Sequence, residues 1–326
     1  MKSSVVLVAV ALPFAACASE DSALRDQATQ LFGRLEAPSA KAVATPEVSL
    51  GRALFWDTRI SLDGKIACAS CHPAEDFGAD RRRASVDARG DHTSRHSPTI
   101  FNSMPQPSLR WLGDRKDGEA QAEGSMTGSM GFASKEVAVA KLAELKYQDA
   151  FKAAYPDEAN ALNAKNYGRA LAAYQATLVT PAPFDRFLAG DDRALTERQK
   201  VGLRTFISTG CAGCHNGALF GGTQFRKFGL VKDYWIETGA AKPDTGRFAI
   251  TKKDEDKYVF RVPMLRNVAR TAPYFHDGSV DSLDRAVKIM GAVQLGRTLD
   301  DATVSLISAF LESLTGEVPA HYAPPR

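Results

Sequence analysis

The chain has 326 residues, enough for about two domains of ordinary size. Hydrophobic residues make up 44% of it and charged residues 24%, as in soluble globular proteins, which excludes a disordered chain and a multi-span membrane protein. The formal net charge is +3, and the one dense basic run, Arg81 to Arg83, is short and followed by acids, so no nucleic-acid binding is expected.

The N-terminus has the pattern of an export signal. Lys2 precedes an apolar stretch from Val5 to Phe14 and then small residues, so residues 1–18 are interpreted as a signal peptide. The stretch is too short to span a bilayer as a permanent helix. Processing has two interpretations: ordinary cleavage after Ala18, or bacterial lipoprotein processing that leaves Cys17 as a lipidated first residue. Both imply export, and we expect the mature protein in the periplasm.

Helical periodicity appears in short, separate segments. Residues 22–36 predict an amphipathic helix, and a Pro- and Ala-rich linker follows at 37–46. Residues 73–133 show little periodicity and predict long loops around a site. Capping residues and apolar spacing predict further helices at 134–147, 163–181, 196–207, 282–290 and 298–314. No alternating strand pattern of useful length is present, so the fold class is mainly α, with a domain boundary near 190–196.

Four of the five cysteines form two C-x-x-C pairs, and a histidine follows each pair. Residues 68–72 read CASCH and residues 211–215 read CAGCH. The spacing suits covalent haem attachment, because two thiols three residues apart on a turn can bond one porphyrin while the histidine lies under the iron. A zinc site or a disulfide is the alternative, but neither pair has a second C-x-x-C nearby. We expect two covalent haem c groups, attached at Cys68 with Cys71 and at Cys211 with Cys214.

The proximal iron ligands in this interpretation are His72 and His215. The sixth position of each iron decides its use, because a methionine there closes the iron and raises its potential, whereas an open position admits peroxide. A methionine is more often core filling than a ligand, so the sequence alone leaves the choice open. The candidates in the mature chain are Met104, Met126, Met130, Met264 and Met290.

Longer stretches of the chain resemble the bacterial di-haem cytochrome c peroxidase family, which includes the MauG-type enzymes. They are LGRALFWDTRISLDGKIACASCH (50–72), SPTIFN (97–102), and VFRVPMLRNVARTAPYFHDGSV (259–280) continuing into LDRAVKIMGAVQLG (283–296). The resemblance covers nearly the whole mature length. It implies two cytochrome c-like domains with haems facing a domain interface: an N-terminal peroxidatic domain at 19–193 and a C-terminal electron-transfer domain at 194–326.

The resemblance also implies roles for individual residues. Met290 matches the sixth ligand of the second haem, where MauG-type enzymes have a tyrosine, so it favours the peroxidase branch. Trp111 matches the tryptophan between the haems, and Gln121, ten residues later, matches a glutamine of the peroxidatic pocket. The implied activity is reduction of hydrogen peroxide to water with electrons from a small cytochrome c or copper protein. A homodimer is one candidate assembly.

Two departures from the family concern the peroxidatic pocket. Counting back from residue 97, the removable distal histidine of the family falls on Ala88, four residues from His92. Either His92 takes that role after a small loop shift, or the first iron is permanently open. Counting ten on from Gln121, the glutamate that assists O–O cleavage falls on Gly131. The nearby acids, none of them in register, are Glu119, Glu123 and Glu136.

A third departure concerns the calcium ion that the family binds between its domains. His96 stands where the family has an asparagine ligand, whereas Thr271 and Pro273, whose backbone carbonyls complete that site, are present. The resemblance therefore implies Ca²⁺ with one ligand changed. His276, in the matched stretch YFHDGS, is interpreted as a structural hydrogen-bonding residue.

Two rival functions stay open at this point. The missing glutamate is compatible with oxidation of side chains on a partner protein, as MauG-type relatives do. A non-enzymatic di-haem electron carrier is the other rival, and it requires both irons to be six-coordinate and low-spin. A high-spin signal from the first haem would exclude the carrier.

Overall fold

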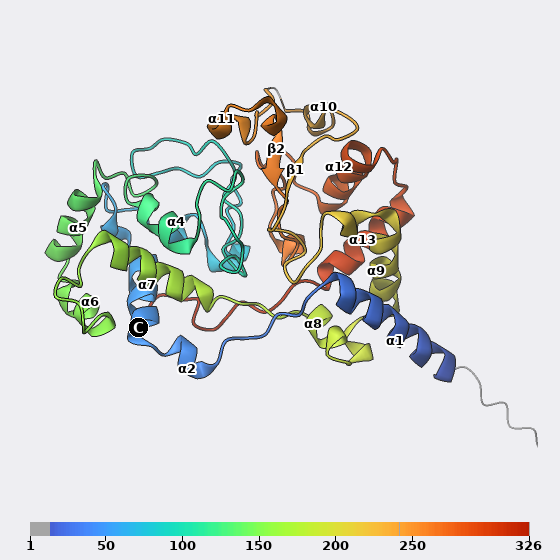
Figure 1. Ribbon diagram of the computed structural model, residues 1–326, viewed down its shortest axis with the longest axis horizontal. Coiled ribbons are helices and arrows are strands. Elements are labelled where there is room, and N and C mark those ends of the chain that lie inside the picture. Colours follow the sequence, from blue (N-terminus) through green and yellow to red (C-terminus); the bar gives the residue numbers. More distant parts are fainter. Residues whose placement is uncertain (1–13, 241, 326) are drawn as a thin grey trace, which may run out of the picture.

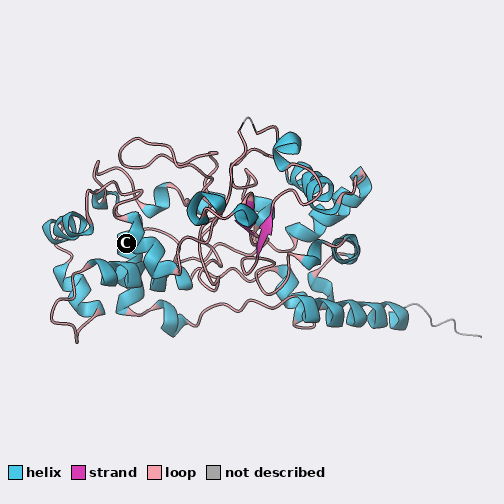
Figure 2. Cartoon of the chain, turned by 45° about the horizontal axis from the view of Figure 1, so that its top comes forward, coloured by secondary structure: helices cyan, strands magenta, loops and turns pink. Residues whose placement is uncertain are grey.

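The computed structural model describes residues 14–240 and 242–325, so most of the predicted signal peptide at 1–18 lies outside the described residues. Helices and connecting loops make up nearly all of the described chain (Figure 2). The helices are α1 (Phe14–Leu31), α2 (Ala40–Val43), α3 (Pro46–Trp56), α4 (Gly118–Ser125), α5 (Lys135–Glu144), α6 (Gln148–Ala154), α7 (Ala164–Ala176), α8 (Pro183–Leu188), α9 (Glu197–Thr209), α10 (Tyr234–Thr238), α11 (Phe248–Thr251), α12 (Leu283–Leu295) and α13 (Asp301–Glu312). The strands are β1 (Phe225–Lys227) and β2 (Val259–Arg261).

The mainly α fold class is confirmed. β1 and β2 pair antiparallel, with Arg226 opposite Phe260, and three residues a strand are too few to produce a visible alternation in the sequence. No helix of the described residues is both long enough and apolar enough to cross a membrane.

The predicted helix starts are confirmed where a side chain caps the first turn. The side chains of Asn163, Thr196 and Ser282 accept hydrogen bonds from backbone amides at the starts of α7, α9 and α12. The last predicted helix is confirmed, and it begins two residues later than predicted, after its cap Asp300. The first helix runs from Phe14 to Leu31 instead of over 22–36.

Seven helices of the described residues lie where none was predicted: α2, α3, α4, α6, α8, α10 and α11. Two of them, α3 and α4, contribute residues to the first cavity described below. α3 begins at the end of the predicted linker, where Thr45 accepts a hydrogen bond from the Val48 amide and Pro46 occupies the first turn, a position that suits proline. α4 lies inside the predicted loop region 73–133, and the Asp117 carboxylate caps it through the Ala120 amide at 2.7 Å. The rest of 73–133 consists of loops, turns and short 3₁₀ turns, as predicted.

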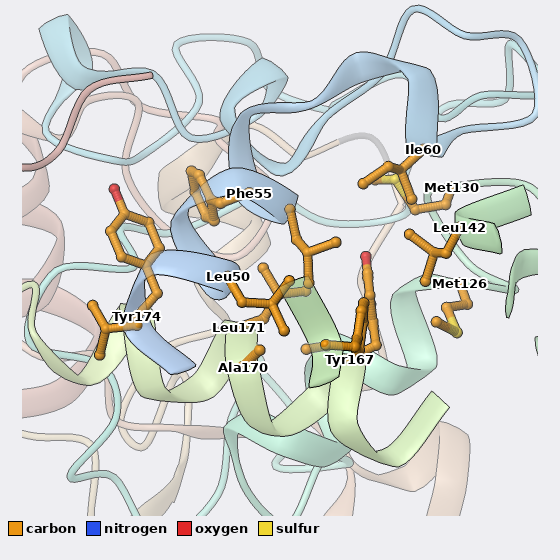
Figure 3. Packing of buried hydrophobic residues seen from close by; sticks show 14 of the residues in the cluster. Leu50, Phe55, Ile60, Met126, Met130, Leu142, Tyr167, Ala170, Leu171 and Tyr174 are labelled. Carbon is orange, nitrogen blue, oxygen red and sulfur yellow. The ribbon is translucent and has the colours of Figure 1, made fainter. Parts of the chain in front are cut away.

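Buried apolar residues form two main clusters. The first is built on α3, α4, α5, α6 and α7, and Figure 3 shows Leu50, Phe55 and Leu171 packed within it. The second is built on α9, α12 and α13, and α1 and α8 also contribute to it. Tyr322, near the C-terminus, packs in the first cluster, whereas Phe32 packs in the second, so each end of the chain reaches the core of the other half (Figure 1).

A glycine brings two helices into close contact in each cluster. A Cβ on Gly51 of α3 would lie 1.9 Å from the carbonyl oxygen of Ala170 in α7. A Cβ on Gly202 of α9 would lie 2.1 Å from the carbonyl oxygen of Leu306 in α13. Both distances are far below van der Waals contact, so only glycine permits this approach.

Candidate functional site

The two C-x-x-C-His motifs line two adjoining cavities. The first cavity, of about 380 Å³, is lined by Cys68, Cys71 and His72. The second cavity, of about 240 Å³, is lined by Cys211, Cys214 and His215. Six residues line both cavities and form a shared wall: His96, Pro98, Thr99, Gln106, Trp111 and Arg261. The structure therefore brings both motifs to one central region between the two clusters.

Each cysteine pair lies on a tight turn, and no disulfide joins its two thiols. The 3₁₀ turns are η2 (Cys68–Ser70) and η5 (Cys211–Gly213). Burial raises the pKa of the Cys68 thiol to about 12 and that of the Cys211 thiol to about 11. A structural zinc site uses four ligands, and no group of three or more His, Cys, Asp or Glu side chains among the described residues is placed to hold a metal ion.

The two histidines are held in the same way. His72 Nδ1 donates to the carbonyl oxygen of Gly78 at 2.7 Å, and His215 Nδ1 donates to that of Phe220 at 3.0 Å. This bond fixes the tautomer that leaves Nε2 free for a metal. Burial lowers the pKa of both imidazoles, and the backbone hydrogen bonds oppose it, so the neutral form that binds metals is favoured. The donor set of each cavity thus fits a covalent haem.

Part of the polar lining of the first cavity comes from α4 and the loop 85–97. Gln121 of α4 lines the cavity, and its buried Oε1 has no hydrogen-bond partner among the described residues. His92 also lines the cavity, and it is exposed to solvent. The lining carboxylates are occupied, because Asp87 binds Arg89 at 2.7 Å and Asp114 binds an arginine at 2.8 Å. Gln121 and His92 are therefore candidate groups to meet a small polar substrate.

The two family positions that depart in the sequence meet each other in the structure. A Cβ on Gly131 would lie 3.2 Å from the Cβ of Ala88, and neither residue lines the first cavity. Gly131 has a φ of 82°, which a glutamate would adopt only with strain. None of Glu119, Glu123 and Glu136 lines the cavity either. Glu123 pairs with a lysine of α5 at 2.6 Å.

The second cavity has a more apolar lining, with two methionines. Met290 of α12 and Met264 both border it, so the predicted ligand has one competitor. Among the other candidates, Met126 and Met130 are 1% and 3% exposed and pack in the first cluster (Figure 3), and Met130 and Met104 also border the first cavity. Core filling therefore describes Met126, which lines neither cavity.

Trp111 is held in the shared wall by hydrogen bonds at both ends. Its indole Nε1 donates to the carbonyl oxygen of His96 at 2.8 Å, and its own carbonyl oxygen accepts from the Arg261 amide at 2.8 Å. His276 stacks on Phe260 with ring centroids 4.1 Å apart, and its buried Nε2 has no hydrogen-bond partner among the described residues. Its carbonyl oxygen accepts from the His96 amide at 2.8 Å.

The candidate calcium residues lie beside the second cavity. Thr271 and Pro273 line it, and their carbonyl oxygens accept no hydrogen bond from other described residues. His96 Nε2 is 2.7 Å from the carbonyl oxygen of Asp80, to which it donates. An imidazole in that role offers Ca²⁺ no oxygen ligand.

The sequence did not point to Arg261 or Gln106 as members of the site. Both line the two cavities, and each has a buried side-chain atom without a partner, Nη1 of Arg261 and Oε1 of Gln106. Arg261 lies within the matched stretch 259–280, but the sequence pattern gives no reason to separate it from its neighbours. Its place in the shared wall distinguishes it.

Comparison with known proteins gives consistent matches along the chain. Residues 45–193 match the family model described as di-haem cytochrome c peroxidase. The cytochrome c551 peroxidase of Pseudomonas aeruginosa is 41% identical over 317 residues, which cover 94% of this chain and 91% of that protein. The cytochrome c551 peroxidase of Nitrosomonas europaea is 37% identical, over 86% and 84% of the two chains. The crystal structure of a MauG-like protein associated with microbial copper homeostasis superposes with a TM-score of 0.77 at 27% identity, covering 90% of this chain and 97% of that one.

Proposed function

This chain belongs to the di-haem cytochrome c peroxidase family and is an oxidoreductase, and on that premise we propose that it is a periplasmic peroxidase that takes electrons from a small cytochrome c or copper protein. The observation that carries the proposal is the shared wall. Two cavities with matching cysteine and histidine sets meet at Trp111, which suits transfer of electrons from one to the other.

The two cavities have different tasks in this proposal. The N-terminal domain, 19–193, holds the peroxidatic haem through Cys68, Cys71 and His72. The C-terminal domain, 194–326, would hold the electron-transfer haem through Cys211, Cys214, His215 and Met290. The polar rim of the first cavity supports the first assignment, and the apolar, methionine-bearing lining of the second supports the other.

The overall reaction consumes one hydrogen peroxide, two protons and two electrons and releases two waters. Haem iron supplies the redox chemistry that cleaves the O–O bond. The chain must orient the peroxide and deliver the protons. The unpartnered Oε1 of Gln121 accepts a hydrogen bond from a peroxide O–H, and His92 at the exposed rim carries protons from solvent to the oxygens. Trp111 lies on the path by which electrons cross the shared wall.

Steady-state turnover tests the proposal. The purified holoenzyme is mixed with hydrogen peroxide and a reduced small cytochrome c or copper protein, and donor oxidation is followed optically. We expect saturable turnover far above that of an equal amount of free haem. A rate no better than free haem, with every donor, contradicts the proposal.

A second candidate function is oxidation of side chains on a partner protein. The observation that favours it is the absence of an unpaired carboxylate among the described residues that line the first cavity. Mass spectrometry of candidate partners after addition of peroxide separates the two functions. New oxygen atoms or cross-links on a partner, without donor-dependent turnover, would support this candidate.

The same proposal includes a calcium ion. It would bind the carbonyl oxygens of Thr271 and Pro273, so chelation should lower turnover and added Ca²⁺ should restore it.

The proposal also includes the location of the protein and its oligomeric state. Fractionation of cells tests the periplasmic location, and the mass of the mature N-terminus distinguishes cleavage after Ala18 from lipidation of Cys17. Light scattering of the purified enzyme tests the homodimer.

A further inference from the structure

Arg261 is a buried cation without a carboxylate partner. The residue is only 5% exposed, and its buried Nη1 has no hydrogen-bond partner among the described residues. Its Nε donates to the carbonyl oxygen of Arg110 at 2.9 Å. Burial lowers the pKa of the guanidinium to about 10, and no nearby acid raises it, so the group is still charged at neutral pH.

Arg266, five residues later, shows how this fold treats a buried arginine that has a partner. It is 1% exposed, and its Nη1 and Nη2 bind the two carboxylate oxygens of Asp185 at 2.7 and 2.9 Å. That bidentate pair is the arrangement expected for a buried guanidinium. A buried charge left unpaired is costly, so the contrast indicates that Arg261 has a partner outside the polypeptide.

The position of Arg261 indicates where that partner lies. Arg261 ends β2 and lines both cavities, and its backbone amide donates to the carbonyl oxygen of Trp111. The partner must therefore be an anion that reaches the shared wall from inside a cavity. Haem carries two propionate carboxylates, which have the charge and the planar geometry that a guanidinium binds best.

We propose that Arg261 binds a haem propionate at the shared wall and thereby positions a haem edge next to Trp111. This inference rests on the proposed binding of haem in the two cavities. Arg261 touches neither peroxide nor iron in this assignment, so it is a positioning residue. Its charge also acts on the iron, because a nearby cation favours the reduced state, which carries one positive charge fewer.

A redox titration of holoenzyme variants tests the inference. We expect Arg261→Gln to lower the midpoint potential of at least one haem, and Arg261→Lys, which keeps the charge, to stay close to the parent. The matched control is Arg198→Gln, which removes an exposed arginine of α9 that lines neither cavity and should leave both potentials unchanged. Parent-like potentials for both haems in Arg261→Gln would overturn the inference.

A second measurement needs no variant. A crystal structure of the parent holoenzyme should show a propionate oxygen about 2.7–2.9 Å from a guanidinium nitrogen of Arg261. A guanidinium that faces only water or backbone carbonyls would overturn the inference even if the Arg261→Gln protein does not accumulate. This outcome is separable from that of the proposed function. A propionate can bind Arg261 in a protein that fails the turnover assay, and a protein that passes the assay can lack this contact.

Discussion

The two cavities share the residues that would attach a haem and differ in the rest of their lining. Each has a cysteine pair on a 3₁₀ turn and a histidine whose Nδ1 donates to a backbone carbonyl. The remaining linings differ. Loop 85–97 and α4 bring His92 and Gln121 to the first cavity, whereas α12 brings Met290 to the second. On the proposed function, the attachment motif would place each haem and the rest of the lining would set what that haem does.

The largest expected effect comes from removing one attachment site at a time. Cys68→Ser/Cys71→Ser should leave one covalent haem and abolish reduction of peroxide. Cys211→Ser/Cys214→Ser should also leave one haem, and should abolish turnover with a protein donor while the first cavity still reacts with peroxide. Haem per chain after denaturation and stopped-flow spectra with peroxide measure both. Equal loss of the peroxide reaction in the two variants would contradict the division of tasks.

The next largest effect concerns the polar rim of the first cavity. Loss of a proton-transfer group costs about 100-fold or more, so His92→Gln should lower kcat/KM for peroxide by about that factor. His321→Gln is the matched control, because His321 bonds to Thr177 at 2.9 Å and lines neither cavity. Parent-like kinetics for His92→Gln would mean that the first iron is permanently open and that protons arrive by another route.

Each half has a pair of helices in contact through a glycine, and substitution of these two glycines tests whether the halves respond independently. Gly51→Ala and Gly202→Ala each force a methyl group against a backbone carbonyl, and overpacking of this kind costs about 1–3 kcal/mol in the free energy of unfolding. Denaturant titration measures that loss. Gly51 lies on a helix of the first cluster and Gly202 on a helix of the second. We therefore expect Gly51→Ala to change the absorption of the haem of the first cavity, and Gly202→Ala that of the second. A change of both haems by either variant would show that the halves are not independent.

The smallest expected effect distinguishes the two methionines of the second cavity. Met290→Leu should remove the axial thioether, lower the potential of that haem and slow donor-dependent turnover about tenfold, or ~1.4 kcal/mol. Met264→Leu keeps the apolar volume at the same cavity and should leave the rate unchanged. The opposite pattern would assign the ligand to Met264.

Most of the helical framework was predictable, because it depends on local signals. Asn163, Thr196 and Ser282 cap their helices through the neighbouring amides, which needs no knowledge of the fold. α4 was missed because an eight-residue helix that contains Gly118 and Gly124 carries almost no apolar periodicity. The packing of Phe32 with the second cluster was beyond reach, because it depends on contacts far apart in the sequence.

The candidate site divides in the same way. The motifs at 68–72 and 211–215 are local, so the sequence located both cysteine turns and both histidines. The contact between Ala88 and Gly131, and the position of Arg261 in a wall common to both cavities, arise from long-range packing. Counting along the chain located Ala88 and Gly131, but it could not show that both lie outside the lining of the first cavity.

One spectroscopic titration tests the central claim, that the two irons differ in their sixth position. The holoenzyme is reduced stepwise from fully oxidised to half reduced while optical and paramagnetic resonance spectra are recorded. We predict that the haem of Cys211 and Cys214 takes up the first electron with methionine bound and low spin, and that the haem of Cys68 and Cys71 then shows a high-spin, open iron. Two haems that both stay six-coordinate and low-spin would contradict the account and leave an electron carrier.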